Sequence, residues 1–229
     1  MSSESLSPEI VTTKAEVFEI MGNYYGNAMY QDAIRIKLTK AELSLITSLL
    51  DEINALGYRF SNLHKLTDKA DLRFMPILLK YYELCERKEW LIDLMCHKEY
   101  AEYTPIIVEK YQHTTNRDLR FSLSNALYAM RKKQYVPLYL DIVNNPDYIG
   151  QNDLIPVILC KYHVQLFSLR FIDLYRLVPD AVAWNLAKYG YMLRDPNMLP
   201  LLEELTNAED KDIAGFAKKS VRAFTNSGL

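Results

Sequence analysis

The segment MLPLLEELTNAEDKDIAGFAKKSVRAF, residues 198–224, decides the fold class of this chain. Its first part, 198–205, is apolar with a proline near its start, and a polar turn at 206–210 follows. Apolar and small residues then recur at steps of three and four, at Ile213, Phe216, Ala217, Ser220 and Phe224. Such steps place side chains on one face of an α-helix. The segment therefore predicts two helices joined by a short turn.

Apolar segments that carry a proline near their start recur upstream of this pair. They contain Pro76, Pro105 and Pro137, and Pro200 belongs to the last copy. The proline spacings are 29, 32 and 63 residues, and the third is close to two periods. The missing copy falls at 169–174, which has the apolar pattern without a proline. Because a fixed period is the signature of repeat architectures, the chain is predicted to be a series of helical pairs.

Each copy is followed by a second helical stretch that opens with an aspartate. An acidic residue at a helix start accepts hydrogen bonds from free backbone N–H groups and offsets the helix dipole. Proline is tolerated in the first turn, because the N–H that it lacks has no partner there. Each copy is thus predicted to be a helix A followed by a helix B, with helix-opening aspartates at Asp118, Asp153, Asp180 and Asp212.

Residues 198–224 resemble a HEAT repeat in their Leu-Pro-Leu-Leu opening at 199–202, in the acidic turn and in the small residues of the second helix. The copies from about 71 to 194 match more loosely, so the resemblance covers about two thirds of the chain. The resemblance implies an all-α fold, a right-handed α–α superhelix (HEAT-like solenoid) with about five helical pairs over 71–229.

Residues 1–70 lack the repeated motif but still read as helical. Capping boxes occur at Thr13–Glu16 and Thr39–Glu42, in which the threonine and the glutamate each bond the other residue's backbone N–H. The second box leads an amphipathic run through Leu43, Ile46, Leu50 and Ile53. Since the end unit of a solenoid must cover an apolar face, 1–70 is predicted to be an N-terminal helical cap packed on the solenoid, within one continuous domain.

Composition and charge indicate a soluble globular protein of the cytoplasm. Of the 229 residues, 49% are hydrophobic and 24% charged, which is close to the average for such proteins. The longest uninterrupted apolar run, 154–160, is too short to span a bilayer, so no membrane association is expected. The N-terminus has no basic region followed by an apolar stretch, so no secretory signal is expected. The three cysteines are widely spaced, as in a protein with reduced thiols: Cys85, Cys96 and Cys160.

No motif for catalysis, cofactor binding or metal binding is present. None of the four histidines lies three or four residues from another histidine or a cysteine, so no helical metal pair exists. The HEAT-like deoxyhypusine hydroxylases carry His-Glu pairs as iron ligands, and this sequence contains no His-Glu dipeptide. P-loop, Gly-x-Gly-x-x-Gly and Gly-x-Ser-x-Gly motifs are also missing. We expect no catalytic residue, cofactor or metal, although a site assembled from several repeats stays open.

Charge separates between the two predicted kinds of helix. The helix B segments 117–133, 153–163, 180–194 and 211–222 hold twelve basic and four acidic residues. The helix A segments with their turns, 100–116, 134–152, 164–179 and 195–210, hold three basic and ten acidic residues. In HEAT-type stacking, helix B of each pair lines the concave surface, so the resemblance implies a basic groove beneath an acidic outer layer.

Aromatic residues are interleaved with these charges. Large aromatic side chains beside arginine are typical anchors of protein interfaces. Two alternatives are simpler: basic residues offset the dipole at helix C-termini, and the aromatic rings pack against the next repeat. The predicted partner-binding residues are Arg117, Arg120, Phe121, Tyr128, Arg131, Trp184, Lys188, Tyr191, Lys211, Lys218 and Arg222.

Two functions compete at this level. The first is a non-catalytic scaffold whose basic, aromatic-containing groove binds a protein partner with an acidic surface, in an immunity-type or adaptor role. The second is nucleic-acid binding, because the HEAT-like alkylpurine DNA glycosylases resemble this chain in length and in their basic concave layer. Those enzymes hold a damaged nucleotide with Trp, Asp and Arg, for which Trp184, Arg117 and Arg120 are candidates here. The net charge of −2 weighs against the second function. The oligomeric state is left open.

Overall fold

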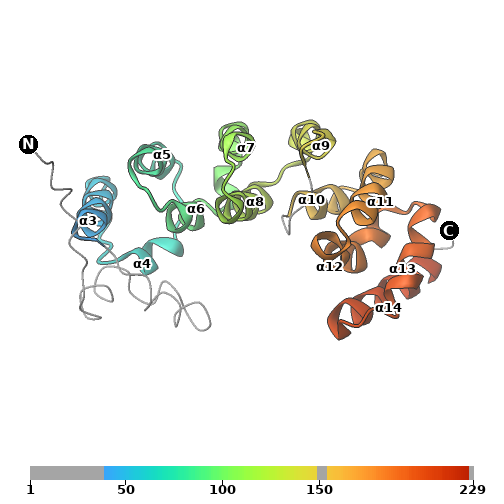
Figure 1. The fold of residues 1–229 in the computed structure, drawn as a ribbon. Coiled ribbons are helices and arrows are strands. Elements are labelled where there is room, and N and C mark those ends of the chain that lie inside the picture. Colours follow the sequence, from blue (N-terminus) through green and yellow to red (C-terminus); the bar gives the residue numbers. More distant parts are fainter. Residues whose placement is uncertain (1–38, 149–153, 227–229) are drawn as a thin grey trace, which may run out of the picture. The chain divides into compact units, whose positions relative to one another are not determined.

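The computed structural model describes residues 39–148 and 154–226, and these are helical throughout apart from the connecting turns (Figure 1). The all-α prediction is therefore confirmed. The chain divides into two units, residues 1–100 and 101–229, each with its own packing. The predicted boundary at residue 70 stays a prediction. The predicted helix start at Thr13–Glu16 and the predicted cap Asp153 lie outside the described residues.

The first unit contains α3 (Lys40–Asn54), α4 (Leu63–Thr67), α5 (Phe74–Leu84) and α6 (Glu89–Leu94). The predicted capping box of α3 is confirmed: Glu42 N–H donates to Thr39 Oγ1 over 3.1 Å, and Thr39 N–H donates to Glu42 Oε2 over 2.7 Å. Helix α3 packs on α5, and α6 packs on both α4 and α5. Trp90 is buried in this core.

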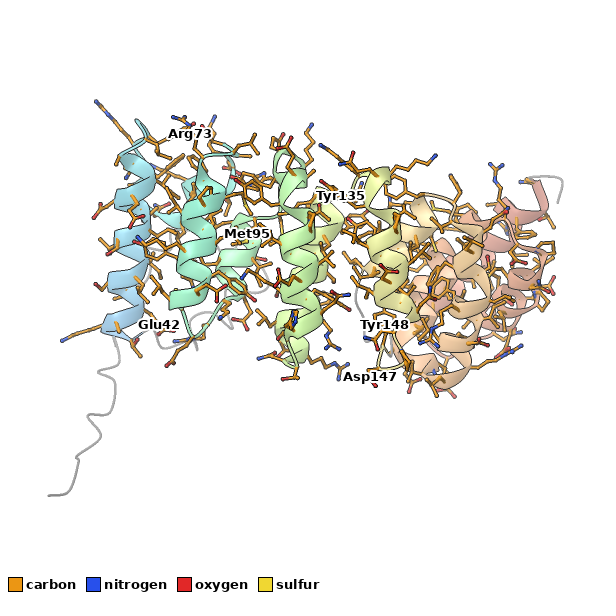
Figure 2. All side chains as sticks on the ribbon, turned by 90° about the horizontal axis from the view of Figure 1, so that it is seen from above. Glu42, Arg73, Met95, Tyr135, Asp147 and Tyr148 are labelled. Carbon is orange, nitrogen blue, oxygen red and sulfur yellow. The ribbon has the colours of Figure 1, made fainter. Side chains whose placement is uncertain are left out.

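Two polar clusters hold the surface of the first unit. Glu42, in the first turn of α3, pairs with Arg87 at 2.5 Å (Figure 2). Asp71 accepts hydrogen bonds from the Tyr58 hydroxyl at 2.6 Å and from Arg73 at 2.5 Å, just before α5. Those bonds, from Arg73 first and then from Tyr58, hold the pKa of Asp71 well below its ordinary value. Both clusters join segments that are distant in sequence, so they stabilise the fold of this unit.

The second unit consists of four helical pairs, preceded by a 3₁₀ turn at Lys98–Tyr103 that spans the division between the units. The first helices of the pairs are α7 (Thr104–His113), α9 (Val136–Asn144), α11 (Ser168–Leu177) and α13 (Leu199–Leu205). The second helices are α8 (Arg117–Met130), α10 (Ile155–Lys161), α12 (Pro179–Tyr189) and α14 (Lys211–Asn226). Short 3₁₀ turns connect several of them, at Lys133–Tyr135, Gln165–Phe167, Gly190–Leu193 and Pro196–Met198.

These bounds agree with the predicted order of A and B helices. Pro105, Pro137 and Pro200 each lie in the first turn of a first helix. The copy without a proline is α11, at the predicted place. Proline also opens α10 and α12, where it was not part of the predicted pattern, at Pro156 and Pro179.

The predicted capping role of the aspartates needs correction. In α8 the cap is Asn116, whose Oδ1 accepts from the N–H of Leu119 at 3.1 Å. Before α14, Asp210 Oδ1 accepts from the N–H of Asp212 and of Ile213. The cap residue thus comes two positions earlier than predicted, because it must precede the first helical residue. Asp118, Asp180 and Asp212 lie in first turns, where they still offset the dipole.

The second helices of the four pairs contact one another in sequence order, α8 with α10, α10 with α12, and α12 with α14. Figure 1 shows α8, α10 and α12 in one row, with α7, α9 and α11 in a second row above it. A hydrogen bond from Ser220 Oγ to the Ala187 carbonyl, 2.5 Å long, joins α14 to α12 inside the core. Leu123, Ala126 and Met130 of α8 and Val182 and Leu186 of α12 are buried, so they form the core faces of these two helices.

Candidate functional site: a cation–aromatic ribbon

Eight side chains along the row of second helices, four cations and four aromatic rings, form a continuous line of contacts. We call this line the cation–aromatic ribbon. It lies entirely within the second unit and crosses α8, α10, α12 and α14. In spatial order its residues are Arg131, Tyr128, Lys161, Tyr189, Lys188, Trp184, Phe216 and Lys219.

The first part of the ribbon joins α8 to α10. The guanidinium carbon of Arg131 lies 4.1 Å from the centroid of the Tyr128 ring. The ammonium of Lys161, at the end of α10, lies 5.6 Å from the same centroid. Two cations from neighbouring helices therefore share the Tyr128 ring.

The centre of the ribbon is the side chain of Lys188. Its ammonium lies 4.2 Å from the Trp184 centroid, 4.8 Å from that of Phe216 and 5.4 Å from that of Tyr189. Trp184 packs edge to face against both other rings, at 6.1 Å from Tyr189 and 5.4 Å from Phe216. Three rings from α12 and α14 thus surround one ammonium group.

Shared rings also make the remaining connections. Lys161 lies 5.9 Å from the Tyr189 centroid, so Tyr189 joins Lys161 to Lys188. Lys219 lies 6.0 Å from the Phe216 centroid, so Phe216 joins Lys188 to Lys219. Each of the four helices contributes one cation, and each neighbouring pair of cations is bridged by one ring.

Local sequence spacing creates these contacts. Tyr128 and Arg131 are three residues apart, as are Phe216 and Lys219, while Trp184 and Lys188 are four apart. Side chains three or four residues apart are neighbours on a helix surface. The contacts between helices then follow from the core face of each helix, which sets how it packs against the next.

The ribbon is partly exposed to solvent, and its cations have no acidic partner among the residues that the structure describes. Trp184 is 39% exposed, and Lys219 is exposed as well. Within residues 39–148 and 154–226, none of the four cations forms an ion pair. Cation–π contacts at exposed sites contribute about 0.5–1 kcal/mol each. The rings therefore hold the charges in place while leaving them free to pair with an incoming anion.

Helix dipoles explain part of the charge placement. Lys161 and Lys188 lie in the last turns of α10 and α12, and Arg131 donates a hydrogen bond from Nη1 to the Tyr128 carbonyl at the end of α8. The dipole of each helix favours a cation at these positions. Lys219 lies in the middle of α14, where the dipole gives no such preference. The dipole also does not account for a ring shared between each pair of cations.

The predicted site residues divide into two groups. Tyr128, Arg131, Trp184 and Lys188 come together in the ribbon. The others make no contact with it among the described interactions: Arg117, Arg120, Phe121, Tyr191, Lys211, Lys218 and Arg222. Arg117, Phe121, Lys211, Lys218 and Arg222 are exposed, and Tyr191 is half-buried in the turn after α12.

The residues Arg117, Phe121, Ser124, Tyr128 and Arg131 follow one another at steps of three and four along α8, and this stripe is interrupted. Ser124, at its middle, is fully buried and accepts a hydrogen bond from the Leu154 N–H at 3.1 Å. The start of α10 therefore covers this position. Phe121, 41% exposed, lies on one side of the covered position and Tyr128 on the other, so they do not form one continuous surface.

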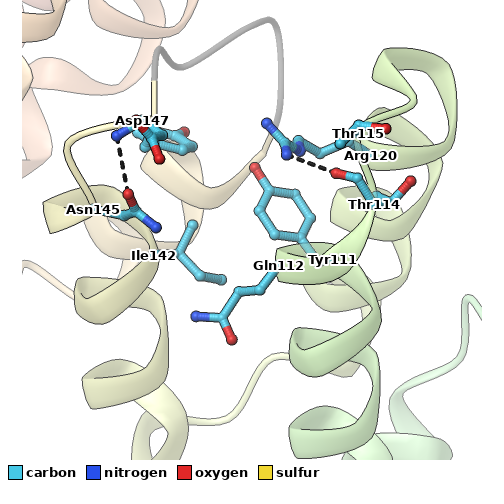
Figure 3. Close-up of a pocket in the computed structure, with 9 residues that line it drawn as sticks. Tyr111, Gln112, Thr114, Thr115, Arg120, Ile142, Asn145 and Asp147 are labelled. Carbon is cyan, nitrogen blue, oxygen red and sulfur yellow. Dashed lines mark hydrogen bonds between the residues drawn. The ribbon is translucent and has the colours of Figure 1, made fainter.

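Arg120 turns away from the ribbon toward α7. Its Nη2 donates to the Thr114 carbonyl at 2.7 Å, and its guanidinium carbon lies 5.6 Å from the Tyr111 centroid. Its Nε is buried without a hydrogen-bond partner. Arg120 also lines a cavity of about 290 Å³ between the end of α7 and the end of α9, where Asp147 and Tyr148 follow α9 (Figures 2 and 3). The cavity also contains the Asp147 carboxylate, so its charges are mixed.

Sequence reasoning missed four ribbon residues. The sequence predicts a partner-binding role for Tyr191 rather than Tyr189, and it places Phe216 on the apolar face of its helix. It gives no reason to select Lys161 or Lys219 among the basic residues of the second helices. In the structure Phe216 is half-exposed and packs on Trp184 instead. The three- and four-residue spacing of cation and ring could have indicated Lys219. The pairs that join different helices have no signal in the sequence.

The described residues offer little for catalysis. Burial raises the pKa of the Cys85 thiol to about 11 and that of Cys96 to about 12, and it raises the pKa of Cys160 further, so no thiolate forms near neutral pH. In the part of the chain that the structure describes, no three His, Cys, Asp or Glu side chains come together as a metal site. There, too, no helix is both long and apolar enough to cross a membrane.

No protein-family model, curated protein or solved structure matches this chain.

Proposed function

We propose that this chain is a non-catalytic binding module whose cation–aromatic ribbon binds a protein partner with an acidic surface. The observation that carries the proposal is the row of four cations, from the end of α8 and from α10, α12 and α14, which are held by shared aromatic rings and form no ion pair within the described residues. Lys219 is exposed and the other three cations are half-buried, and such a row of positive charge favours an anionic surface by charge complementarity. The rings restrict the long side chains before binding, which lowers the entropy lost when a complex forms.

The same proposal includes the HEAT-like solenoid, in which the second helices would line the concave side. A short solenoid offers a rigid surface for a partner and suits an immunity-type, adaptor or scaffold role. The proposed location is the cytoplasm, where thiols stay reduced, and all three cysteines are free.

Nucleic acid is a weaker fit to the ribbon. Proteins that bind single strands use aromatic rings as platforms on which bases stack. Here cations already lie over the rings, at 4.1 Å from Tyr128 and 4.2 Å from Trp184, so stacking would require their displacement. The site that the alkylpurine glycosylases imply is also not assembled, because Trp184 contacts residues of α12 and α14 while Arg120 turns to Thr114.

The test is capture of a partner from the native lysate, with and without nuclease treatment, followed by binding measurements with purified components. The informative variant is Lys161→Glu with Lys188→Glu, which reverses two central charges of the ribbon. Lys218→Glu is the matched control, since it reverses an exposed charge on α14 beside Lys219 but outside the ribbon. Circular dichroism and thermal melting establish that each variant folds.

We expect the double variant to lose the partner and Lys218→Glu to keep it. If the partner bound both variants as tightly as it binds the unaltered protein, the ribbon would not be the binding site. Recovery of nucleic acid alone, released by nuclease or by high salt, would overturn the protein-binding proposal, because phosphate contacts weaken steeply with salt.

A further inference from the structure

We infer that the ribbon takes an extended acidic segment of its partner, in the polyproline II conformation, with a carboxylate at every third residue. This inference rests on the proposed function and deepens it by naming the form of the partner. The observation behind it is the single-file order of the four cations: Arg131, Lys161, Lys188 and Lys219.

The helix packing and the shared rings together bound the spacing of the cations. The cations come from α8, α10, α12 and α14, each in contact with the next. Packed helices are about 8–10 Å apart. The shared rings set an upper limit: each cation lies within 6.0 Å of the centroid that it shares with its neighbour. Neighbouring cations can therefore be no farther apart than twice that distance.

Polyproline II matches this repeat. It rises about 3.1 Å per residue with three residues per turn, so every third side chain lies on the same face, about 9 Å farther along. A β-strand rises about 3.3 Å per residue and alternates its faces. Its same-face side chains therefore recur at about 7 Å, which is shorter than the separation of packed helices, or at about 13 Å, which exceeds the limit set by the shared rings.

A helical partner fits less well. An α-helix would need a carboxylate at every seventh residue, about 10 Å apart, and more than twenty residues to reach four cations. A helix also binds by laying an apolar face into a groove. The ribbon offers rings already covered by cations, for example Trp184 and Phe216 by Lys188. A thin, charged, extended segment is the occupant that fits both the spacing and the chemistry.

The experiment compares two synthetic peptides with the full chain by fluorescence anisotropy at low salt. The first is twelve residues long, four repeats of Glu-Pro-Ser. The second has the same composition with its glutamates in adjacent pairs at the two ends, so that net charge and proline content are equal. A twelve-residue oligothymidine is the nucleic-acid probe.

We expect the regularly spaced peptide to bind about five- to tenfold more tightly than its isomer, because only it reaches all four cations at once. Lys161→Gln with Lys188→Gln should abolish this preference. Arg176→Gln, a change at an exposed arginine on α11, should keep it.

Each other outcome overturns part of the argument. Equal binding of the two peptides, lost in the double variant, would refute the three-residue spacing and leave the acidic-partner proposal standing. A preference that survives the double variant would place the peptide site elsewhere. Binding of oligothymidine without either peptide would overturn both the inference and the proposed function. Binding of none of the three probes would overturn the inference.

Discussion

The ammonium of Lys188 lies 4.2 Å from the centroid of the Trp184 ring, one helical turn away on α12. The contact places a cation and the more exposed of the two tryptophans in one small region, since Trp90 is buried. Tryptophan fluorescence therefore reports on the ribbon directly.

Iodide should quench Trp184 fluorescence about threefold or more efficiently than caesium, because the four cations raise the local concentration of anions. Stern–Volmer titrations with the two ions measure this ratio. The difference should shrink as the salt concentration rises, through screening. In the Trp184→Phe variant the remaining emission comes from buried Trp90, and the preference for iodide should disappear. Equal quenching by both ions would show that the ribbon cations do not act at the ring.

Ser124→Ala should lower the free energy of unfolding of the second unit by about 1–3 kcal/mol. The change removes the acceptor of the Leu154 N–H, at 3.1 Å, and leaves a polar group without a partner where α10 begins. Urea denaturation followed by circular dichroism measures the loss. Ser122→Ala, on the same helix, is the control and should alter stability by no more than about 0.5 kcal/mol. If the two variants were equally stable, the hydrogen bond between Ser124 and Leu154 would make no net contribution to the free energy of unfolding.

Glu42→Gln should cost about 0.2–1 kcal/mol of stability at pH 7, and this cost should vanish in acid. Burial opposes ionisation of Glu42, but hydrogen bonds from Arg87 and Thr39 outweigh it and lower its pKa. A carboxyl with a lowered folded-state pKa stabilises the fold above the ordinary glutamate pKa of about 4.3, and the stabilisation is lost as the pH falls through the folded-state value.

Urea midpoints measured from pH 7 to pH 3 for the unaltered protein and for Glu42→Gln test this dependence. Glutamine can still cap α3, so the difference isolates the pair with Arg87. Asp173→Asn, at an exposed carboxyl on α11, is the control and should show little change. A cost for Glu42→Gln that stays constant across the range would contradict the pairing.

The three thiols should react slowly with a disulfide reagent at pH 7.5 in the folded protein and rapidly in guanidinium chloride. Burial raises the pKa of the Cys85 thiol to about 11 and that of Cys96 to about 12, so very little thiolate is present. Release of the coloured thiol product measures the number and rate of reacting groups. One fast equivalent in the folded state would reveal an activated cysteine and reopen the case for nucleophilic catalysis.

Local patterns in the sequence determined the helices themselves. Proline-headed apolar segments indicated α7, α9 and α13, and three- and four-residue spacing indicated the face of α14 on which Ala217, Ser220 and Phe224 are buried. These predictions succeeded because helix formation and amphipathicity depend on residues within a few positions of one another. The cap residues were misplaced by two positions, since the choice among Asn116, Asp118 and their neighbours depends on where the first helical turn begins.

Only the tertiary structure decided which surface residues act together. The sequence by itself determined that second helices carry basic and aromatic residues, and it identified four of the eight that form the ribbon. It could not show that Tyr128 serves both Arg131 and Lys161, or that Phe216 faces Trp184 rather than the core. Contacts between helices depend on their separation and rotation, which the packing of the whole core sets. The same packing buried Ser124 under Leu154 and divided a stripe that is continuous along α8 in the sequence.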